Sequence, residues 1–343
     1  MSKFELRKTT REDARELNAL YHIHTGIERT NQQFAWEWFD GPYGPAPSWV
    51  VIDQDSRRIA AHHGVIPCPL WLNGRIIKAA RTENSMVTPE YQGKVLYVAY
   101  ESVILKKLME DYDLIFTTTG KGTPGIVRKK LGYRSIGYWR TFTLHEPLAY
   151  LATRTAGDLA GRIVSKLTPK QSNRRGDLSL EHTVNTGRVA ALWESSRNAY
   201  KFTPQRDAAY LKWRLLDNPF NQSKFAIVTK DGEDFGFIAW SERRTNLKAK
   251  DIIIEDIFCQ NNDLQSYQAL VYIFKNSLGF LPARITLRAL LADNALCGAA
   301  ALNTPRRLRH NEFRNGAELL VQTRAEVDLP ISTMTMLISE GIN

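Results

Sequence analysis

The stretch Ser85-Met86-Val87-Thr88-Pro89-Glu90-Tyr91-Gln92-Gly93-Lys94-Val95-Leu96 decides how the rest of this chain is interpreted. Residues 80–88 form a predicted strand that leads into it. Beyond it, apolar residues recur at helical spacing at Leu96, Ala99 and Val103. The stretch is therefore predicted to join a strand to a helix through a turn that contains Gly93.

A turn of this kind is a natural place for an anion to bind. A helix that begins directly after a strand presents unpaired backbone N–H groups and the positive end of its dipole to the turn. Gly93 has no Cβ, so a phosphate can approach the backbone closely. We expect the N–H groups of Gly93, Lys94, Val95 and Leu96 to form the anion site, with added charge from Lys94. The residues alone also allow an ordinary strand-to-helix turn.

Outward from this stretch, the first part of the chain reads as alternating strands and helices. A capping box at residues 10–13 precedes a helix, and Asn73-Gly74 predicts a hairpin turn. A helix after Thr123-Pro124 should end at Gly132. The predicted strands cover residues 4–7, 49–53, 58–67, 71–77, 80–88, 113–119 and 138–144.

The second part repeats this order of elements. A basic connector at 154–176 is predicted to hold one helical piece at 159–167. Helices are then predicted at 188–200, 207–216, 264–278 and 294–302, and strands at 224–229, 235–241, 251–258, 283–289 and 318–326. With 343 residues the chain is long for one domain, so we predict an N-terminal lobe at 1–148, a connector at 149–178 and a C-terminal lobe at 179–343.

Composition excludes several classes of protein. No apolar run is long enough to cross a bilayer, and the N-terminus lacks the apolar core of a signal peptide. Cys68, Cys259 and Cys297 are too widely spaced to indicate a disulfide framework or a zinc site. We expect a cytoplasmic, reduced protein with no transmembrane segment and no metal.

The formal net charge of +10 needs an explanation. Nucleic acid is one possible partner of a basic protein, but no nucleic-acid-binding motif accompanies the Lys and Arg residues, so we expect none. Two readings remain open, a solvated basic surface and a field that attracts a phosphate-bearing cofactor or an acidic carrier protein. Much of the excess lies at Arg154, Arg162, Lys166, Lys170, Arg174, Arg175, Arg306, Arg307 and Arg309.

The stretch at 85–96 resembles the cofactor motif of the GNAT (N-acetyltransferase) superfamily, Gln/Arg-x-x-Gly-x-Gly/Ala after a strand and before a helix. Here Glu90 and Val95 stand at the motif's first and last positions. The ending Lys130-Leu131-Gly132-Tyr133 after the next strand and helix also resembles this family. The resemblance implies an α/β (α+β) fold of two tandem GNAT-like lobes, each a mixed, mostly antiparallel sheet flanked by helices.

A narrower resemblance is to tandem GNAT acyltransferases of bacterial cell-surface polysaccharide clusters. Its motifs are a Trp-rich segment at 36–39, the strand His62-His63-Gly64-Val65-Ile66-Pro67, and Tyr210-Leu211-Lys212-Trp213-Arg214 followed by Asn218-Pro219. This subgroup would make the protein a bacterial enzyme.

The resemblance implies transfer of an acyl group from acetyl-CoA, or another acyl-CoA, to an amine in a ternary complex. The implied cofactor-binding residues are Met86, Val87, Thr88, Gln92, Gly93, Lys94, Val95 and Leu96. A main-chain N–H near Val87 would hold the oxyanion. In the second lobe, residues 259–263 contain no glycine and place Asp263 where the phosphate should lie, so we expect no cofactor there.

Three residues are candidates for proton transfer. Glu83 lies on the strand entering the turn, where carboxylates of the family act as bases, although a structural carboxylate is an equal alternative. His62 and His63 are adjacent on a strand, so at most one faces a cleft, and a buried structural histidine is the common alternative. Arg128 stands at the position where the family resemblance implies a Tyr that acts as the general acid. Tyr133 is expected to be a packed aromatic.

Three functions follow from these patterns. The first is an N-acetyltransferase acting on a small-molecule amine, an amino sugar or amino acid. The second is a long-chain N-acyltransferase that uses acyl carrier protein, and the third is a binding protein without catalysis. In each case we expect a cleft between the lobes that opens to Glu83 and to His62 or His63.

Overall fold

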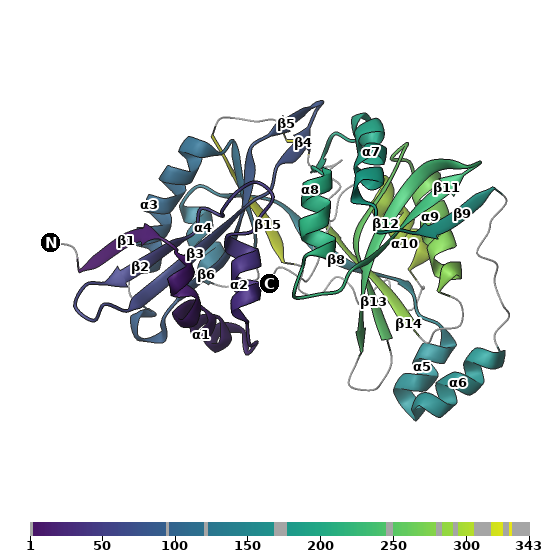
Figure 1. The fold of residues 1–343 in the computed structure, drawn as a ribbon, viewed down its shortest axis with the longest axis horizontal. Helices are drawn as coiled ribbons and strands as arrows, with labels where there is room; N and C mark the ends of the chain where they lie inside the picture. Colours follow the sequence, from purple (N-terminus) through teal and green to yellow (C-terminus); the bar gives the residue numbers. More distant parts are fainter. Residues whose placement is uncertain are drawn as a thin grey trace.

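Twelve strands of the described residues form one sheet that runs through both halves of the molecule (Figure 1). The computed structural model describes residues 3–93, 96–119, 123–167, 177–244, 250–278, 283–290, 294–304, 317–324 and 329–330. In spatial order the strands are β1 (Phe4–Lys8), β2 (Trp49–Asp53), β3 (Ile59–Pro67), β6 (Ala79–Val87), β7 (Leu114–Thr119), β15 (Glu318–Thr323), β8 (Arg134–His145), β14 (Ala283–Leu290), β13 (Lys250–Cys259), β12 (Glu233–Arg244), β11 (Lys224–Lys230) and β9 (Leu178–His182).

The strand pairing is mixed and mostly antiparallel, which confirms the expected fold class. Only β6 with β7 and β13 with β14 pair in parallel among the described strands. A second, small sheet joins β10 (Phe202–Pro204) to the hairpin of β4 (Leu70–Leu72) and β5 (Arg75–Ile77). That hairpin turns at Asn73 and Gly74, both with positive φ, as the sequence predicted.

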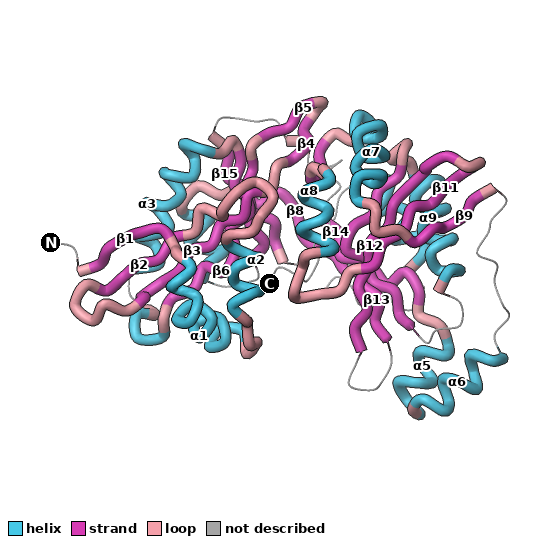
Figure 2. Tube along the Cα trace, viewed as in Figure 1, coloured by secondary structure: helices cyan, strands magenta, loops and turns pink. Residues whose placement is uncertain are grey.

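Helices cover both faces of the sheet (Figures 1 and 2). The N half, which we define as β1–β3, β6, β7, β15 and their helices, carries α1 (Ala14–Thr25), α2 (Asn31–Trp38), α3 (Leu96–Asp111) and α4 (Thr123–Lys130). The C half, defined as β9 and β11–β14 with their helices, carries α5 (Leu148–Ala156), α6 (Asp158–Leu167), α7 (Thr186–Ser196), α8 (Ala208–Leu211), α9 (Leu264–Ser277) and α10 (Ala295–Asn303).

In the N half, apolar clusters lie on both faces of the strands. In the N half, Ile52 and Leu17 belong to a cluster on the α1 and α2 face, whereas Val51 and Ile104 belong to a cluster on the α3 face. Adjacent residues of β2 thus point to opposite sides, as strand geometry requires. Tyr133 is buried in the α3 cluster, which confirms it as a packed aromatic.

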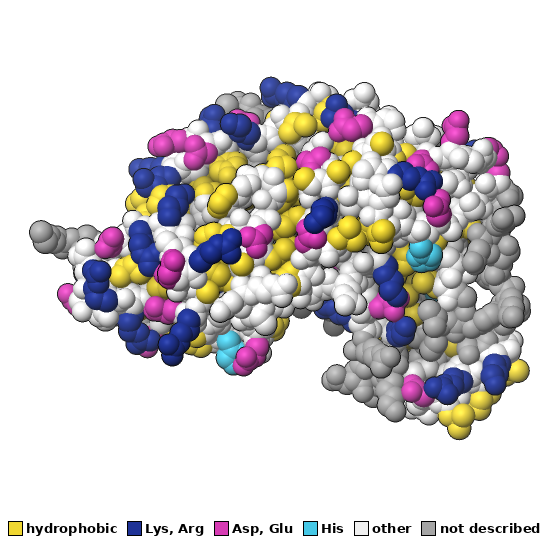
Figure 3. Space-filling view, in the orientation of Figure 1, with side chains coloured by type: hydrophobic (Ala, Val, Ile, Leu, Met, Phe, Trp, Pro, Cys, Tyr) yellow, Lys and Arg dark blue, Asp and Glu magenta, His cyan; other side chains and the backbone are white. Residues whose placement is uncertain are grey.

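Several elements were not foreseen. Helix α2 and strands β9 and β10 had no clear pattern, and the connector holds two helices, α5 and α6, where one was predicted. Among the described residues, no helix is long and apolar enough to cross a membrane. On the face shown in Figure 3, Lys and Arg side chains are dispersed among Asp and Glu.

The C-terminal strand β15 corrects the expectation of one sheet per lobe. β15 lies between β7 and β8, and Leu320 pairs with Thr117 on one side and Ser135 on the other. β8 pairs with β15 through its first part and with β14 from Trp139 onward. The predicted boundaries at 148 and 178 remain predictions, but backbone pairing crosses them, because the N half is completed by residues from the far end of the chain.

The burial of Leu320 gives a test of this pairing. Leu320 is fully buried in the α3 cluster of the N half, so Leu320→Ala should lower the free energy of unfolding by about 2–5 kcal/mol. Chemical denaturation measures the loss, and hydrogen exchange should show it first in β7 and β6. Leu302→Ala, at a half-exposed position of α10, is the control. Loss of protection confined to β11–β13 would contradict the assignment of β15 to the N half.

Candidate active site

The two parallel strands of the N half separate partway along their length. β6 and β7 are in register from Ala79 with Leu114 to Arg81 with Phe116, and beyond this point β6 continues to Val87 without further pairing to β7. A bulge in β6 lies opposite His63, and Asn84 within it has φ +48°. The separation leaves β6 backbone groups open toward β7 at the place where an oxyanion donor was predicted.

The turn after β6 has the predicted strand, turn and helix order. β6 ends at Val87 and α3 begins at Leu96, while Lys94 and Val95 lie outside the described residues. Gly93 has φ +76°, and a Cβ built there would meet nothing within 4 Å, so the space above it is open. Glu90 is exposed, and its carboxylate lies 4.0 Å from the guanidinium of Arg58.

The remaining predicted cofactor residues surround this turn. The side-chain amide of Gln92 donates to the carbonyl of Val87 at 3.1 Å, and Thr88 donates its hydroxyl to the carbonyl of Ile59 at 2.8 Å. Met86 is buried in the α1 and α2 cluster. The structure thus holds the turn in a fixed shape, and cofactor binding by these residues remains a prediction.

The corresponding turn in the C half is closed by its own side chain. β13 ends at Cys259, and Asp263 caps α9 by accepting a hydrogen bond from the backbone N–H of Ser266 at 2.8 Å. The carboxylate therefore already satisfies the helix N-terminus that a phosphate would need. The expectation that the C half holds no cofactor remains a prediction.

Arg128 of α4 bridges β6 and β7 where they have separated. Its guanidinium donates to Ser85 Oγ of β6 at 2.8 Å, to Thr117 Oγ1 of β7 at 2.7 Å and to Glu101 Oε1 of α3 at 2.9 Å. Burial lowers the pKa of Arg128, but the carboxylate of Glu101 outweighs burial and the pKa lies above its ordinary value. Arg128 therefore keeps its positive charge inside the strand separation.

His63 joins the same buried network. Its Nδ1 lies 2.9 Å from Glu101 Oε2 and 3.1 Å from Ser85 Oγ. Burial by itself would raise the pKa of Glu101. His63 and Arg128 lower it by more than burial raises it, so the pKa is about 2. Glu101 is thus an anion that holds together residues of β3, α3 and α4.

His62 points to the opposite face of β3 and is fully buried. Its Nδ1–H donates to the carbonyl of Asn84 at 3.0 Å, and its ring meets Trp38 edge to face. Burial lowers its pKa to about 3, so the ring is neutral at physiological pH. Gly64 allows this packing, because a Cβ there would lie 2.1 Å from the Trp38 ring.

Two carboxylates lie on the other face of β6. Glu83 is ion-paired with Arg81, and burial raises its pKa. Glu37 of α2 accepts hydrogen bonds from Arg29 Nη1 at 2.7 Å and from the Asn84 side-chain amide at 2.8 Å. The pKa of Glu37 is raised to about 7. Burial is the main cause, the nearby charge of Arg29 lowers the pKa, and the charge of Glu83 raises it.

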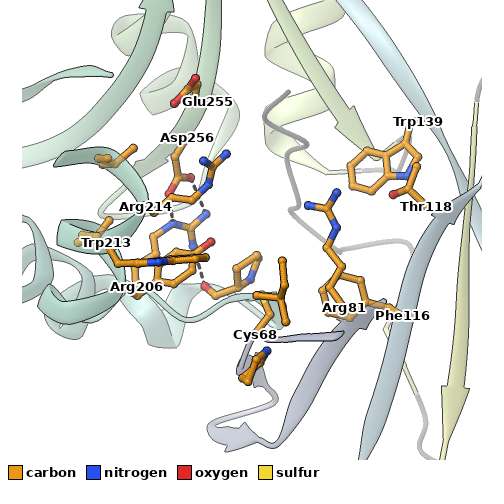
Figure 4. A pocket seen from close by; sticks show the side chains of 16 residues that line it. Cys68, Arg81, Phe116, Thr118, Trp139, Arg206, Trp213, Arg214, Glu255 and Asp256 are labelled. Carbon is orange, nitrogen blue, oxygen red and sulfur yellow. Dashed lines mark hydrogen bonds and ion pairs between the residues drawn. The ribbon is translucent and has the colours of Figure 1, made fainter. Parts of the chain in front are cut away.

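A pocket lies where the two halves meet (Figure 4). Residues of both halves line the pocket, as expected for a cleft between them, but Glu83, His62 and His63 are not among its lining residues. The expectation that the cleft opens to them is wrong, because both histidines are covered by packing. Side chains that line it include Arg81, Phe116 and Thr118 from the N half and Arg206, Arg214 and Asp256 from the C half.

Sequence reasoning missed Glu37, Glu101 and the lining role of Arg214. Glu101 lies on the buried stripe of α3 with Ile104 and Leu108, and a charged residue on an apolar stripe is a detectable signal. Cys68 lines the pocket as an intact thiol whose pKa burial raises to about 11. Among the described residues, no group of three or more His, Cys, Asp or Glu side chains could hold a metal ion.

Known structures share this arrangement over nearly the whole chain. A GCN5-related N-acetyltransferase from Anabaena variabilis aligns with a TM-score of 0.64 and 15% identity, over 94% of this chain and 73% of that one. A probable N-acyltransferase from Enterococcus faecalis aligns with a TM-score of 0.61 and 12% identity, over 94% and 73%. Saccharomyces cerevisiae N-myristoyltransferase with bound myristoyl-CoA aligns with a TM-score of 0.60 and 12% identity, over 94% and 79%.

No protein-family model and no curated protein sequence matches the chain. The structural similarities show that the chain has the fold of the GCN5-related N-acetyltransferases, as the motif at 85–96 implied. The same fold carries N-myristoyltransferase. The narrower resemblance to polysaccharide-cluster enzymes remains a prediction.

The ion pair of Arg128 and Glu101 gives a test of the buried network. Removing one partner leaves an uncompensated buried charge, so Arg128→Met should cost roughly 3–5 kcal/mol of stability. The double variant Arg128→Met with Glu101→Gln should recover part of that loss, because no carboxylate is then left unpaired. Urea denaturation of the single and double variants measures the difference. Equal stability of the two variants would show that the pair is not coupled.

The raised pKa of Glu37 predicts a pH dependence of stability. A carboxyl whose pKa is higher in the folded than in the unfolded chain stabilises the fold fully below pH 4.5, and this contribution is lost as the pH rises through about 7. Glu37→Gln should therefore remove a decline of roughly 3 kcal/mol between these pH values. Unfolding curves across this range measure it, with Glu28→Gln at an exposed position as control. An unchanged pH slope in Glu37→Gln would contradict the assignment.

Proposed function

We propose that the protein is an N-acyltransferase that moves an acyl group from acyl-CoA, with acetyl-CoA as the leading donor, to a small-molecule amine. The observation that carries the proposal is the separation of β6 from β7 after Arg81, followed by the open turn at Gly93 and the start of α3. This arrangement offers unpaired backbone donors to an acyl carbonyl and a helix start to a pyrophosphate.

The described residues fit an acyl-CoA donor, which supplies the activated acyl group as a thioester. The open space above Gly93 leaves room for phosphates beside the backbone. Backbone N–H groups of β6 near Val87 would hold the developing oxyanion. Saccharomyces cerevisiae N-myristoyltransferase, which has the same fold, binds myristoyl-CoA, and this supports an acyl-CoA donor here.

Arg128 takes the place of the Tyr acid that the family resemblance implies. Because its pKa is raised, Arg128 would hold a departing thiolate by charge and hydrogen bonding and would not release a proton to it. Ser85 and Thr117 hold the guanidinium in the strand separation, close to where the sulfur would leave. Transition-state charge would thus be stabilised by a fixed cation.

A carboxylate would take the proton from the acceptor amine. Glu83 remains the predicted base, and Glu37 is an additional candidate because its pKa of about 7 suits proton transfer at neutral pH. The two carboxylates lie near each other, since Glu83 raises the pKa of Glu37. His62 and His63 would be structural, because His62 donates to the carbonyl of Asn84 and His63 is held by Glu101 and Ser85.

A longer acyl chain is the second candidate donor. The similarity to N-myristoyltransferase favours it, and exposed basic residues such as Arg162 and Lys166 on α6 would suit an acidic acyl carrier protein. Loss of catalysis with retention of binding is the third reading. We also propose a cytoplasmic location, no metal and no nucleic-acid partner.

The turn at Gly93 tests the proposed cofactor site. Gly93→Asp would place a carboxylate beside the pyrophosphate, so the affinity for CoA should fall more than tenfold, about 1.4 kcal/mol or more. Isothermal titration calorimetry with CoA measures the change. Gly93→Ala separates backbone strain at φ +76° from added charge, and Asn262→Asp, at a positive-φ position of the C half, should leave binding unchanged.

Two results would overturn the proposed function. One is the absence of CoA binding by the unmodified protein. The other is equal CoA affinity of the unmodified protein and Gly93→Asp. Binding of CoA without thiol release in the presence of any acceptor would favour the non-catalytic reading.

A further inference from the structure

The pocket between the halves contains a buried cation, Arg214, whose terminal nitrogens have no hydrogen-bond partner in the part of the chain that the structure describes. Arg214 is 7% exposed, and the two nitrogens concerned are Nη1 and Nη2. A buried guanidinium left unpaired is costly, because it has lost its hydration and gained no counter-charge. Such a group in the wall of a cavity indicates a ligand that completes it.

The segment that carries Arg214 is held firmly. Arg214 lies in a π-helical segment, Lys212–Leu216. Such segments are rare in proteins, and those that occur are often found at functional sites. Trp213 stacks on Trp36 of the N half at 4.5 Å, and each indole N–H donates to the other residue's carbonyl, at 3.0 and 3.2 Å. The backbone on which Arg214 stands is therefore fixed against the opposite half.

The carboxylates that line the pocket are engaged elsewhere. Asp256 accepts both hydrogen bonds of a bidentate pair with Arg206, each at 2.8 Å. Glu255 accepts hydrogen bonds from the side chains of Asn221 and Ser223. Neither carboxylate lies within ion-pair distance of Arg214, so the charge of Arg214 is not matched within the described part of the chain.

A second guanidinium faces the same space from the N half. Figure 4 shows Arg81 and Arg214 extending into the pocket from opposite walls. Arg81 is paired with Glu83 and is the last residue of β6 in register with β7. The pocket therefore adjoins the point where the strands begin to separate, which is the proposed position of the acyl donor.

We propose that this pocket binds the acceptor amine through an anionic group, a carboxylate or a phosphate, held by Arg214 with Arg81 on the opposite wall. Guanidinium groups match these anions in shape and bind them bidentately. Tyr210, Trp213 and Trp139 supply aromatic walls for the carbon framework of the acceptor. The inference rests on the proposed acyltransferase function for the amine, whereas the anion site can be tested separately.

The first experiment measures anion binding without catalysis. The thermal unfolding temperature is recorded with inorganic phosphate or acetate against chloride at equal ionic strength, with CoA present to fill the turn at Gly93. Phosphate, acetate or both should raise the unfolding temperature of the unmodified protein. The control variant Arg15→Gln, at an exposed position of α1, should show the same rise. The rise should be smaller in Arg214→Gln and in Arg214→Lys. Because Arg214 Nη1 and Nη2 have no hydrogen-bond partner among the described residues, Arg214→Gln should fold with undiminished stability. Equal stabilisation of Arg214→Gln, or none of the unmodified protein, would overturn the anion site.

The second experiment compares matched acceptors by thiol release from acetyl-CoA. The pairs are glucosamine 6-phosphate with glucosamine, and amino acids with their amides. The charged member of one pair should have a kcat/KM at least tenfold higher, which distinguishes phosphate from carboxylate. In Arg214→Gln, the ratio of kcat/KM between the charged and the neutral member of that pair should fall toward one. Equal rates within both pairs, or an equal loss for charged and neutral acceptors, would overturn the proposal. If no amine of the panel is acylated, the first experiment decides.

The two proposals fail separately. If calorimetry shows no CoA binding while phosphate still stabilises the protein through Arg214, the acyltransferase proposal fails and the anion site stands. If CoA binds and is turned over but Arg214→Gln behaves as the unmodified protein does, the anion site fails and the acyltransferase proposal stands.

Discussion

Backbone hydrogen bonding through β8 is the interaction on which the rest of the structure depends. β8 pairs with β15 in one half and with β14 in the other, so a single strand belongs to both parts of the sheet. Backbone ladders fix strand positions more firmly than side-chain contacts between separate domains, which usually leave room for relative motion. The pocket between the halves has defined walls for this reason, and Arg81 and Arg214 can face each other although they lie far apart in the sequence.

The same constraint explains how β15 is used. A parallel pair that separates, as β6 and β7 do, needs a neighbour on the outer side of β7 to keep that strand in place. β15 supplies this neighbour, and its Leu320 enters the core beneath α3. The strand separation and the chain's C-terminal segment are thus coupled through β7. The small sheet of β10 with β4 and β5 adds a second link between the halves.

Within the separation, a charged network stands where the family resemblance implies a neutral tyrosine. Arg128, Glu101, His63, Ser85 and Thr117 form a buried set of polar groups contributed by helices and strands of the N half. A buried ion pair adds little net stability but is strongly disrupted when one partner is lost. The arrangement keeps the guanidinium of Arg128 fixed in the strand separation, where a positive charge can stabilise negative charge that develops on a bound group. At the corresponding turn of the C half, the side chain of Asp263 caps the N-terminus of α9.

The sequence by itself determined the local elements and their order. The Asn73-Gly74 turn, the helix end at Gly132 with φ +99° and the strand, turn and helix at Gly93 follow from backbone preferences of a few neighbouring residues, and the structure contains all three. These local signals, with the motif they form, were enough to indicate the fold and the region of the candidate site. Tertiary structure alone decided the placement of β15, the burial of both histidines and the meeting of Arg81 with Arg214. Those features depend on contacts between residues far apart in the chain, and a pattern of neighbouring residues carries no information about which distant partner a strand edge or a charged side chain will meet.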